Sequence, residues 1–173
     1  ALKPILDCGH LLFGENKVQE ASAKWLDLLK IYKDLEIHMV GGLQSNKINE
    51  AISIFTCIHS VDRKKILEGI NKSLSKDSLL KDVFIQINIS NESSKGGIGV
   101  SEIDSFLEGS KNYKKINILG LMTMPPPNEE PSVYFALLNN LAKKNSLKYL
   151  SMGMSNDLET AIALGATHIR VGE

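Results

Sequence analysis

The sequence has 173 residues, of which 43% are hydrophobic and 23% charged, a composition typical of a globular domain with a substantial core. Twenty basic and twenty acidic side chains give a formal net charge of zero, so charge gives no reason to expect nucleic acid or an anionic membrane as the main partner. No apolar run approaches the roughly 18 residues of a transmembrane helix, and the first residues lack the architecture of a signal peptide.

Apolar helices and short strands alternate along the chain. A helix is predicted to end at Gly9, and an amphipathic helix is predicted over residues 17–32, with Val18, Ala21 and Trp25 on its apolar side. Strands are predicted near residues 12, 38, 58, 86, 119, 150 and 169, and the one over 83–89 is apolar enough to be buried on both faces. This alternation indicates a parallel sheet or barrel.

The count of strands narrows the fold class. Seven predicted strands are one fewer than a closed (β/α)8 barrel contains. The chain also opens within a helix that would follow the missing strand. We therefore interpret the fold as α/β, a (β/α)8 TIM-type barrel that lacks its first strand and its C-terminal helix. We expect one domain over residues 1–173, truncated at both ends relative to the intact gene product.

Polar and flexible residues follow the predicted strands where such a barrel carries its active site. They are Asn16, His38, the segment 44–47, Asn88, Lys95, Met124, the segment 151–155, Arg170 and Gly172. The pattern alone leaves a functional site and a solvated rim equally open.

The stretch 150–173 has the pattern of a phosphate site. It is predicted as a strand, a loop centred on Gly153, a helix with Asn156 as its N-cap, and a last strand over 168–171. The free N–H groups at a helix start, together with the helix dipole, favour an anion. The alternative is structural: Ser155 and Asn156 could cap the helix only, and Arg170 could form an internal ion pair.

Several of these segments resemble the pyridoxal-phosphate homeostasis protein family. They are 13–20 (FGENKVQE), 38–47 (HMVGGLQSNK), 86–89 (QINI), 94–98 (SKGGI), 120–125 (GLMTMP), 151–157 (SMGMSND) and 170–173 (RVGE), in the family's order along the whole chain. The resemblance implies a barrel like the N-terminal domain of alanine racemases. It also implies pyridoxal 5′-phosphate (PLP) as the cofactor.

The resemblance also implies roles for the strand-end residues. Ser155 and the backbone around Met154, Gly172 and Glu173 would hold the phosphate. Arg170 would face the pyridine nitrogen and, because a guanidinium keeps its proton, would leave that nitrogen unprotonated. The ring would then be a weaker electron sink, which suits a binding protein.

Further residues would surround the cofactor ring. Lys95 would lie near the phenolic oxygen, Met124 would pack near the ring and Asn16 would line the pocket. The plainer alternatives are a solvated loop lysine for Lys95 and core packing for Met124 and Met154. His38 is interpreted as a core histidine with its hydrogen bonds satisfied.

One departure from the family pattern bears on chemistry. The family's Schiff-base lysine belongs to an AVSK-like segment at the end of the first strand, which would lie before Ala1, and the AIFG-like closing segment would follow Glu173. We therefore assign no catalytic residue. Without that lysine, only noncovalent binding of the cofactor would remain.

The resulting hypothesis is a cytoplasmic protein that holds and delivers PLP and maintains vitamin B6 homeostasis. Its expected partners are PLP and PLP-dependent apo-enzymes, and a monomer is expected. The second domain that supplies an acid/base tyrosine in alanine racemases is absent from the chain, which favours binding over catalysis. The alternatives are a PLP-dependent amino-acid racemase or decarboxylase, and a PLP-independent phosphosugar enzyme. Cys8 and Cys57 are expected to be free thiols, and no metal-ligand spacing is apparent.

Overall fold

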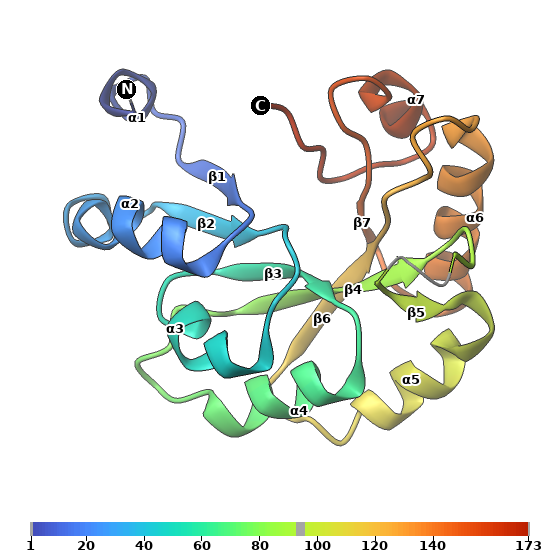
Figure 1. Ribbon diagram of the computed structural model, residues 1–173, viewed down its shortest axis with the longest axis horizontal. Coiled ribbons are helices and arrows are strands. Elements are labelled where there is room, and N and C mark those ends of the chain that lie inside the picture. The colour runs from blue at the N-terminus through green and yellow to red at the C-terminus, as the bar shows by residue number, and fades with distance from the viewer. Residues whose placement is uncertain (1, 93–95, 173) are drawn as a thin grey trace.

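The computed structural model describes residues 2–92 and 96–172, which alternate between strands and helices (Figure 1). The strands are β1 (Leu12–Glu15), β2 (Glu36–Met39), β3 (Cys57–Val61), β4 (Asp82–Asn88), β5 (Ile98–Gly99), β6 (Asn117–Met122) and β7 (Tyr149–Ser151). The helices are α1 (Lys3–Asp7), α2 (Val18–Ile31), α3 (Ile48–Ile52), α4 (Lys64–Ser73), α5 (Ile103–Ser110), α6 (Pro131–Lys144) and α7 (Leu158–Ala163), with 3-10 turns η1 (Ser45–Lys47) and η2 (Val100–Glu102).

The strands form one parallel sheet in the order β1-β2-β3-β4-β6-β7, with the short β5 paired to β4. The sheet curls, and α2 to α6 lie along its outer side, while β1 and α7 stand on opposite sides of the opening (Figure 1). Because all the pairs are parallel, the carboxyl ends of the strands point the same way. Loops far apart in sequence are thereby gathered at one end of the sheet.

Most of the predicted strands are confirmed, and the last is wrong. Near residue 169 the chain makes only an isolated bridge between Ser151 and His168. Past that bridge the N–H of Arg170 donates to the carbonyl of Gly153, one residue beyond the regular parallel register, and Gly153 has a φ of +98°, so the regular ladder ends there. The strand β5, by contrast, was not anticipated.

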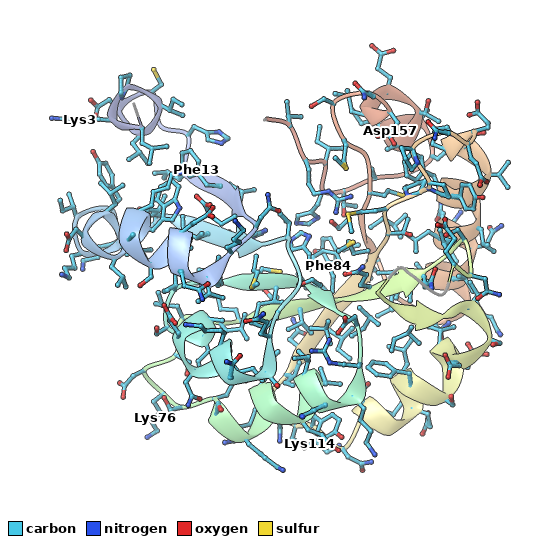
Figure 2. All side chains as sticks on the ribbon, viewed as in Figure 1. Lys3, Phe13, Lys76, Phe84, Lys114 and Asp157 are labelled. Carbon is cyan, nitrogen blue, oxygen red and sulfur yellow. The ribbon has the colours of Figure 1, made fainter. Side chains whose placement is uncertain are left out.

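The core follows the alternation of side chains along the strands. The outer face of the sheet packs its apolar residues against the helices, as Ile58 and Ile85 do together with Trp25 of α2 and Phe135 of α6. The inner face carries a smaller cluster of Cys57, Phe84, Met122 and Leu119. Phe84 lies near the centre of the molecule, between the β1 side and the α7 side (Figure 2).

Helix α2 illustrates how the pattern produces the packing. Val18, Ala21 and Trp25 recur at helical spacing and are buried, as predicted. Within the part of the chain that the structure describes, no helix is both long enough and apolar enough to cross a membrane.

Candidate functional site

The structure places the predicted site residues at the carboxyl ends of the strands. Asn16 directly follows β1, and Met124 follows β6 by two residues; Met154 and Ser155 lie in the loop after β7. All four are exposed to solvent, as is Gly172. The predictions for Lys95 and Glu173 fall outside the described residues.

Arg170 is the most deeply held of these side chains. Its backbone N–H donates to the carbonyl of Gly153 at 2.9 Å. Its guanidinium donates to the carbonyl of Thr123 at 3.1 Å and, at a long 3.5 Å, to the hydroxyl of Ser151. These bonds fasten the last segment to the ends of β6 and β7. Burial lowers the pKa of Arg170, and the negative charge of Asp157 opposes that shift.

The Nε–H of Arg170 is buried and finds no hydrogen-bond partner among the described residues. A buried donor without a partner is costly in a folded protein, so such groups commonly mark a missing ligand or water. The site therefore fits a ligand that brings an acceptor to this guanidinium. Among the described residues the Arg170 side chain bonds to a carbonyl and a hydroxyl, and no carboxylate lies within ion-pair distance of it.

The loop after β7 differs in detail from the sequence prediction. Helix α7 begins at Leu158 with Asp157 as its N-cap residue, so the prediction that Asn156 caps it is wrong. Asp157 Oδ1 accepts the N–H of Met154 at 2.5 Å, and the N–H of Asp157 donates to the carbonyl of Met154 at 3.0 Å. This reciprocal pair closes a turn that contains Ser155 and Asn156, and the helix starts only after it.

The backbone at Gly172 has free space beside it. Gly172 has a φ of +139°, which side-chain-bearing residues rarely adopt, and a Cβ added there would meet nothing within 4 Å.

Two cavities, of about 420 and 310 Å³, lie elsewhere: one between α5 and the start of β6, the other near the starts of β2 and β4. The carboxyl-end site is neither of these two cavities.

Behind Arg170 the structure brings His38 and Ser151, both among the predicted strand-end residues, together with His59, which the sequence analysis did not single out. His59 Nδ1 lies 2.7 Å from the hydroxyl of Ser151, and His59 Nε2 lies 3.0 Å from His38 Nδ1. Beyond them, His38 Nε2 lies 3.7 Å from a carboxylate oxygen of Glu36. The prediction of a buried, hydrogen-bonded His38 is confirmed, and its partner, His59, is the residue that the sequence analysis overlooked.

The histidines of this group are uncharged at neutral pH. Burial lowers the pKa of His38 to about 4, and the neighbouring His168 acts in the same direction. Burial lowers the pKa of His59 to about 2, with further contributions from His38, His168 and Arg170. Phe84 stacks on His59 with ring centroids 4.4 Å apart, which is part of that dry environment. The period of two along β2, β3 and β7 could have placed His38, His59 and Ser151 on one face.

Comparison with known proteins assigns the chain to a family. The family model described as alanine racemase, N-terminal domain, matches residues 2–173. The pyridoxal phosphate homeostasis protein of Aquifex aeolicus (strain VF5) is 37% identical over 180 residues, which cover 99% of this chain and 78% of that protein. The protein of that name from Escherichia coli (strain K12) is 34% identical, with coverage of 99% and 77%.

The chain belongs to the pyridoxal phosphate homeostasis protein family. Among solved structures of such relatives, PipY of Synechococcus elongatus PCC7942 without PLP has a TM-score of 0.91 at 32% identity, covering 99% of this chain and 84% of that one. PipY with PLP bound has a TM-score of 0.85 at the same identity. Alanine racemase from Corynebacterium glutamicum is 18% identical with a TM-score of 0.66, a likeness of fold. The predicted family and barrel class are confirmed.

Proposed function

We propose that the chain binds PLP at the carboxyl ends of its strands, holds and delivers the cofactor, and so maintains vitamin B6 homeostasis. The observation that carries this proposal is Arg170. Its guanidinium is fixed by Thr123 and Ser151 while its buried Nε–H has no partner among the described residues. A heteroaromatic nitrogen or a phosphate oxygen would satisfy that donor.

The remaining contacts are proposed from the position of each residue. Ser155, Met154, Gly172 and Glu173 would hold the phosphate, and the exposed turn after β7 together with the open backbone at Gly172 suits a bulky anion. Asn16, Lys95 and Met124 would line the ring. Bound PLP supplies an aldehyde and an electron-accepting ring.

Arg170 sets the electronic state of such a ligand. Although burial lowers its pKa, an arginine remains protonated in proteins and offers donors only. A ring nitrogen facing it must accept a hydrogen bond and stay unprotonated. This arrangement weakens electron withdrawal by the ring and suits storage of the cofactor better than carbanion chemistry.

A carrier role is also supported by the relatives. The proteins that are 32–37% identical over nearly the whole chain are named homeostasis proteins, whereas the racemase likeness is at 18% identity and covers 46% of that enzyme. We further propose that the protein is cytoplasmic and monomeric and passes PLP to apo-enzymes. The free Cys8 and Cys57 are consistent with a reducing compartment.

The test is a double variant, Ser155→Ala with Arg170→Ala. We expect it to lose at least tenfold in PLP affinity, measured as cofactor retained after gel filtration over a range of PLP concentrations. The control is Ser53→Ala with Lys115→Ala, which changes the same kind of groups at the amino ends of β3 and β6 and should keep full retention. Equal retention by the two double variants would refute the placement of the site.

A second measurement separates carrier from enzyme. Chiral amino acids are incubated with the PLP-loaded protein, and loss of optical activity or release of carbon dioxide is followed. The carrier proposal predicts rates no higher than those of free PLP. Sustained turnover above that level would instead support a racemase or a decarboxylase.

A further inference from the structure

The inner face of the sheet gathers three side chains of metal-ligating type below the strand ends. His38 lies on β2, and Cys57 and His59 lie on β3. One nitrogen of each histidine and the sulfur of Cys57 all lie within 4.8 Å of one another. Cys57 and His59 are 2% exposed and His38 is 9% exposed, so the cluster is almost dry.

The spacing of these atoms is close to that of ligands on one ion. Two imidazole nitrogens bound to a tetrahedral zinc ion, at about 2.0–2.1 Å each, are roughly 3.3 Å apart. His59 Nε2 and His38 Nδ1 are 3.0 Å apart. A sulfur and a nitrogen on one such ion are about 3.6 Å apart, whereas the sulfur of Cys57 lies within 4.8 Å of one nitrogen of each histidine, so it would have to approach by up to about 1.2 Å.

The outer nitrogens of the two imidazoles already have the partners that metal-bound histidines use. His59 Nδ1 faces the hydroxyl of Ser151 at 2.7 Å, and His38 Nε2 faces the carboxylate of Glu36 at 3.7 Å. Such second contacts orient the ring and fix which nitrogen is free to bind. When both outer nitrogens carry the ring protons, the two facing nitrogens, which otherwise share a hydrogen bond, both offer lone pairs to an ion.

The donor set and its surroundings select the kind of ion. Two neutral imidazoles and one thiolate favour a soft or borderline cation over Mg²⁺ or Ca²⁺. The positive charge of Arg170 lowers the pKa of His59 and would likewise disfavour a bound ion that leaves net positive charge at the site. A monovalent ion bound to one thiolate gives a neutral complex. A divalent ion keeps one positive charge and would take a fourth ligand. His168 is a candidate, since its ring centroid lies 5.6 Å from that of His59.

We propose that His38, Cys57 and His59 form a site for a thiophilic d10 metal ion, Zn²⁺ or Cu⁺, inside the curled sheet. Binding forms one metal–sulfur and two metal–nitrogen bonds, and the thiol proton of Cys57 leaves to solvent. The proton shared between His59 Nε2 and His38 Nδ1 moves to the outer nitrogen of the ring that carries it, so both facing nitrogens can bind the ion. Burial raises the pKa of that thiol, so affinity increases with pH. The site lies beside Arg170 and meets it through Ser151, whose hydroxyl contacts both His59 and Arg170, but its three ligands are not among the residues proposed to hold PLP.

The experiment uses the full gene product, stripped of metal by a chelator. In one arm Co²⁺ is added as a spectroscopic substitute for Zn²⁺; in the other, Cu⁺ is added without oxygen in competition with a coloured Cu⁺ chelator. We expect one ion per chain in at least one arm. A thiolate-to-metal charge-transfer band should mark it, and in the cobalt arm Zn²⁺ should remove that band.

Matched variants locate the ion. Cys57→Ser should abolish the charge-transfer band, and His59→Gln should weaken binding at least tenfold. Cys8→Ser and His10→Gln change the same residue types at exposed positions and should bind like the parent. Circular dichroism checks that each variant folds.

Two results would overturn the proposal, and the first needs no variant. The parent protein could take up no ion in either arm, which would leave a hydrogen-bonded histidine pair only. Alternatively, the band could persist in Cys57→Ser, which would move the ion to another thiol.

Discussion

The two faces of the same sheet are built from different chemistry. Adjacent residues of β4 show the contrast: Ile85 joins the apolar layer under the helices, whereas Phe84 faces inward and stacks on His59. Both side chains are fully buried. On the outer face burial serves packing, while on the inner face it surrounds histidines, a thiol and the hydroxyl that meets Arg170.

The difference shows how one strand serves two purposes. Since successive side chains point to opposite faces, a strand can contribute an aliphatic residue to the core and a polar one to the interior without any change in backbone. The outer layer should therefore determine stability and be indifferent to ligands. The inner layer should determine pH dependence and ligand binding at a smaller cost in stability.

The largest effect is expected on the outer face. Ile85→Ala removes a fully buried side chain from the helix–sheet layer and should lower the free energy of unfolding by about 2–5 kcal/mol, measured by urea denaturation. PLP retention per folded molecule should not change. Ile31→Ala, at a position that is 70% exposed, is the control and should stay within about 0.5 kcal/mol of the parent. A loss under 1 kcal/mol for Ile85→Ala would contradict the view that the outer face of the sheet determines stability.

This outer layer is the part of the molecule that the sequence predicted well. The apolar spacing of Val18, Ala21 and Trp25 and the apolar run through β4 have one stable solution, a helix packed on a parallel strand. The last strand was mispredicted because the apolar pattern around Ile169 indicates burial but does not show that regular pairing with β7 ends near Gly153. Periodicity detects burial, but it does not detect where a ladder stops.

The second effect concerns pH and arises on the inner face. The folded protein holds the pKa of His38 at about 4 and that of His59 at about 2, below the ordinary value of 6.5. Below pH 6.5 the unfolded chain therefore binds protons that the folded chain cannot, and stability falls as the pH falls. At about 1.36 kcal/mol per pH unit, His38 alone accounts for a loss of about 3 kcal/mol by pH 4.

Urea denaturation at several pH values between 7 and 4 measures this slope. His38→Gln should reduce the slope by about half, because glutamine can keep a hydrogen bond to His59 without titrating while His59 still contributes. The exposed His10→Gln should leave it as in the parent. If stability were the same at pH 7 and pH 4 in the parent, the inner histidines would be open to water.

The sequence indicated candidate residues at the strand ends but not their contacts. Short motifs at 151–157 and 170–173 identified Arg170, Ser155 and Gly172 as candidates, because a family resemblance compares residues in their order along the chain. The partners of Arg170 are harder to see, because Thr123 contributes a backbone carbonyl and Ser151 lies on another strand. His59 pairs with a residue 21 positions away, so no local spacing connects them. These contacts depend on strand order, which the sequence does not state.

The smallest effect is expected at Ser151, the residue that joins the two parts of the inner face. Ser151→Ala removes the partner of His59 Nδ1 and one contact of Arg170, and should cost about 1 kcal/mol in the free energy of unfolding. PLP affinity should fall by a few-fold, less than in the double variant Ser155→Ala with Arg170→Ala, because the bond from Arg170 to Thr123 remains. Ser53→Ala, whose exposed hydroxyl donates to a helix carbonyl, is the control for both measurements. A loss of PLP affinity in Ser151→Ala as large as that of Ser155→Ala with Arg170→Ala would mean that Ser151, rather than the carbonyl of Thr123, holds the guanidinium in place.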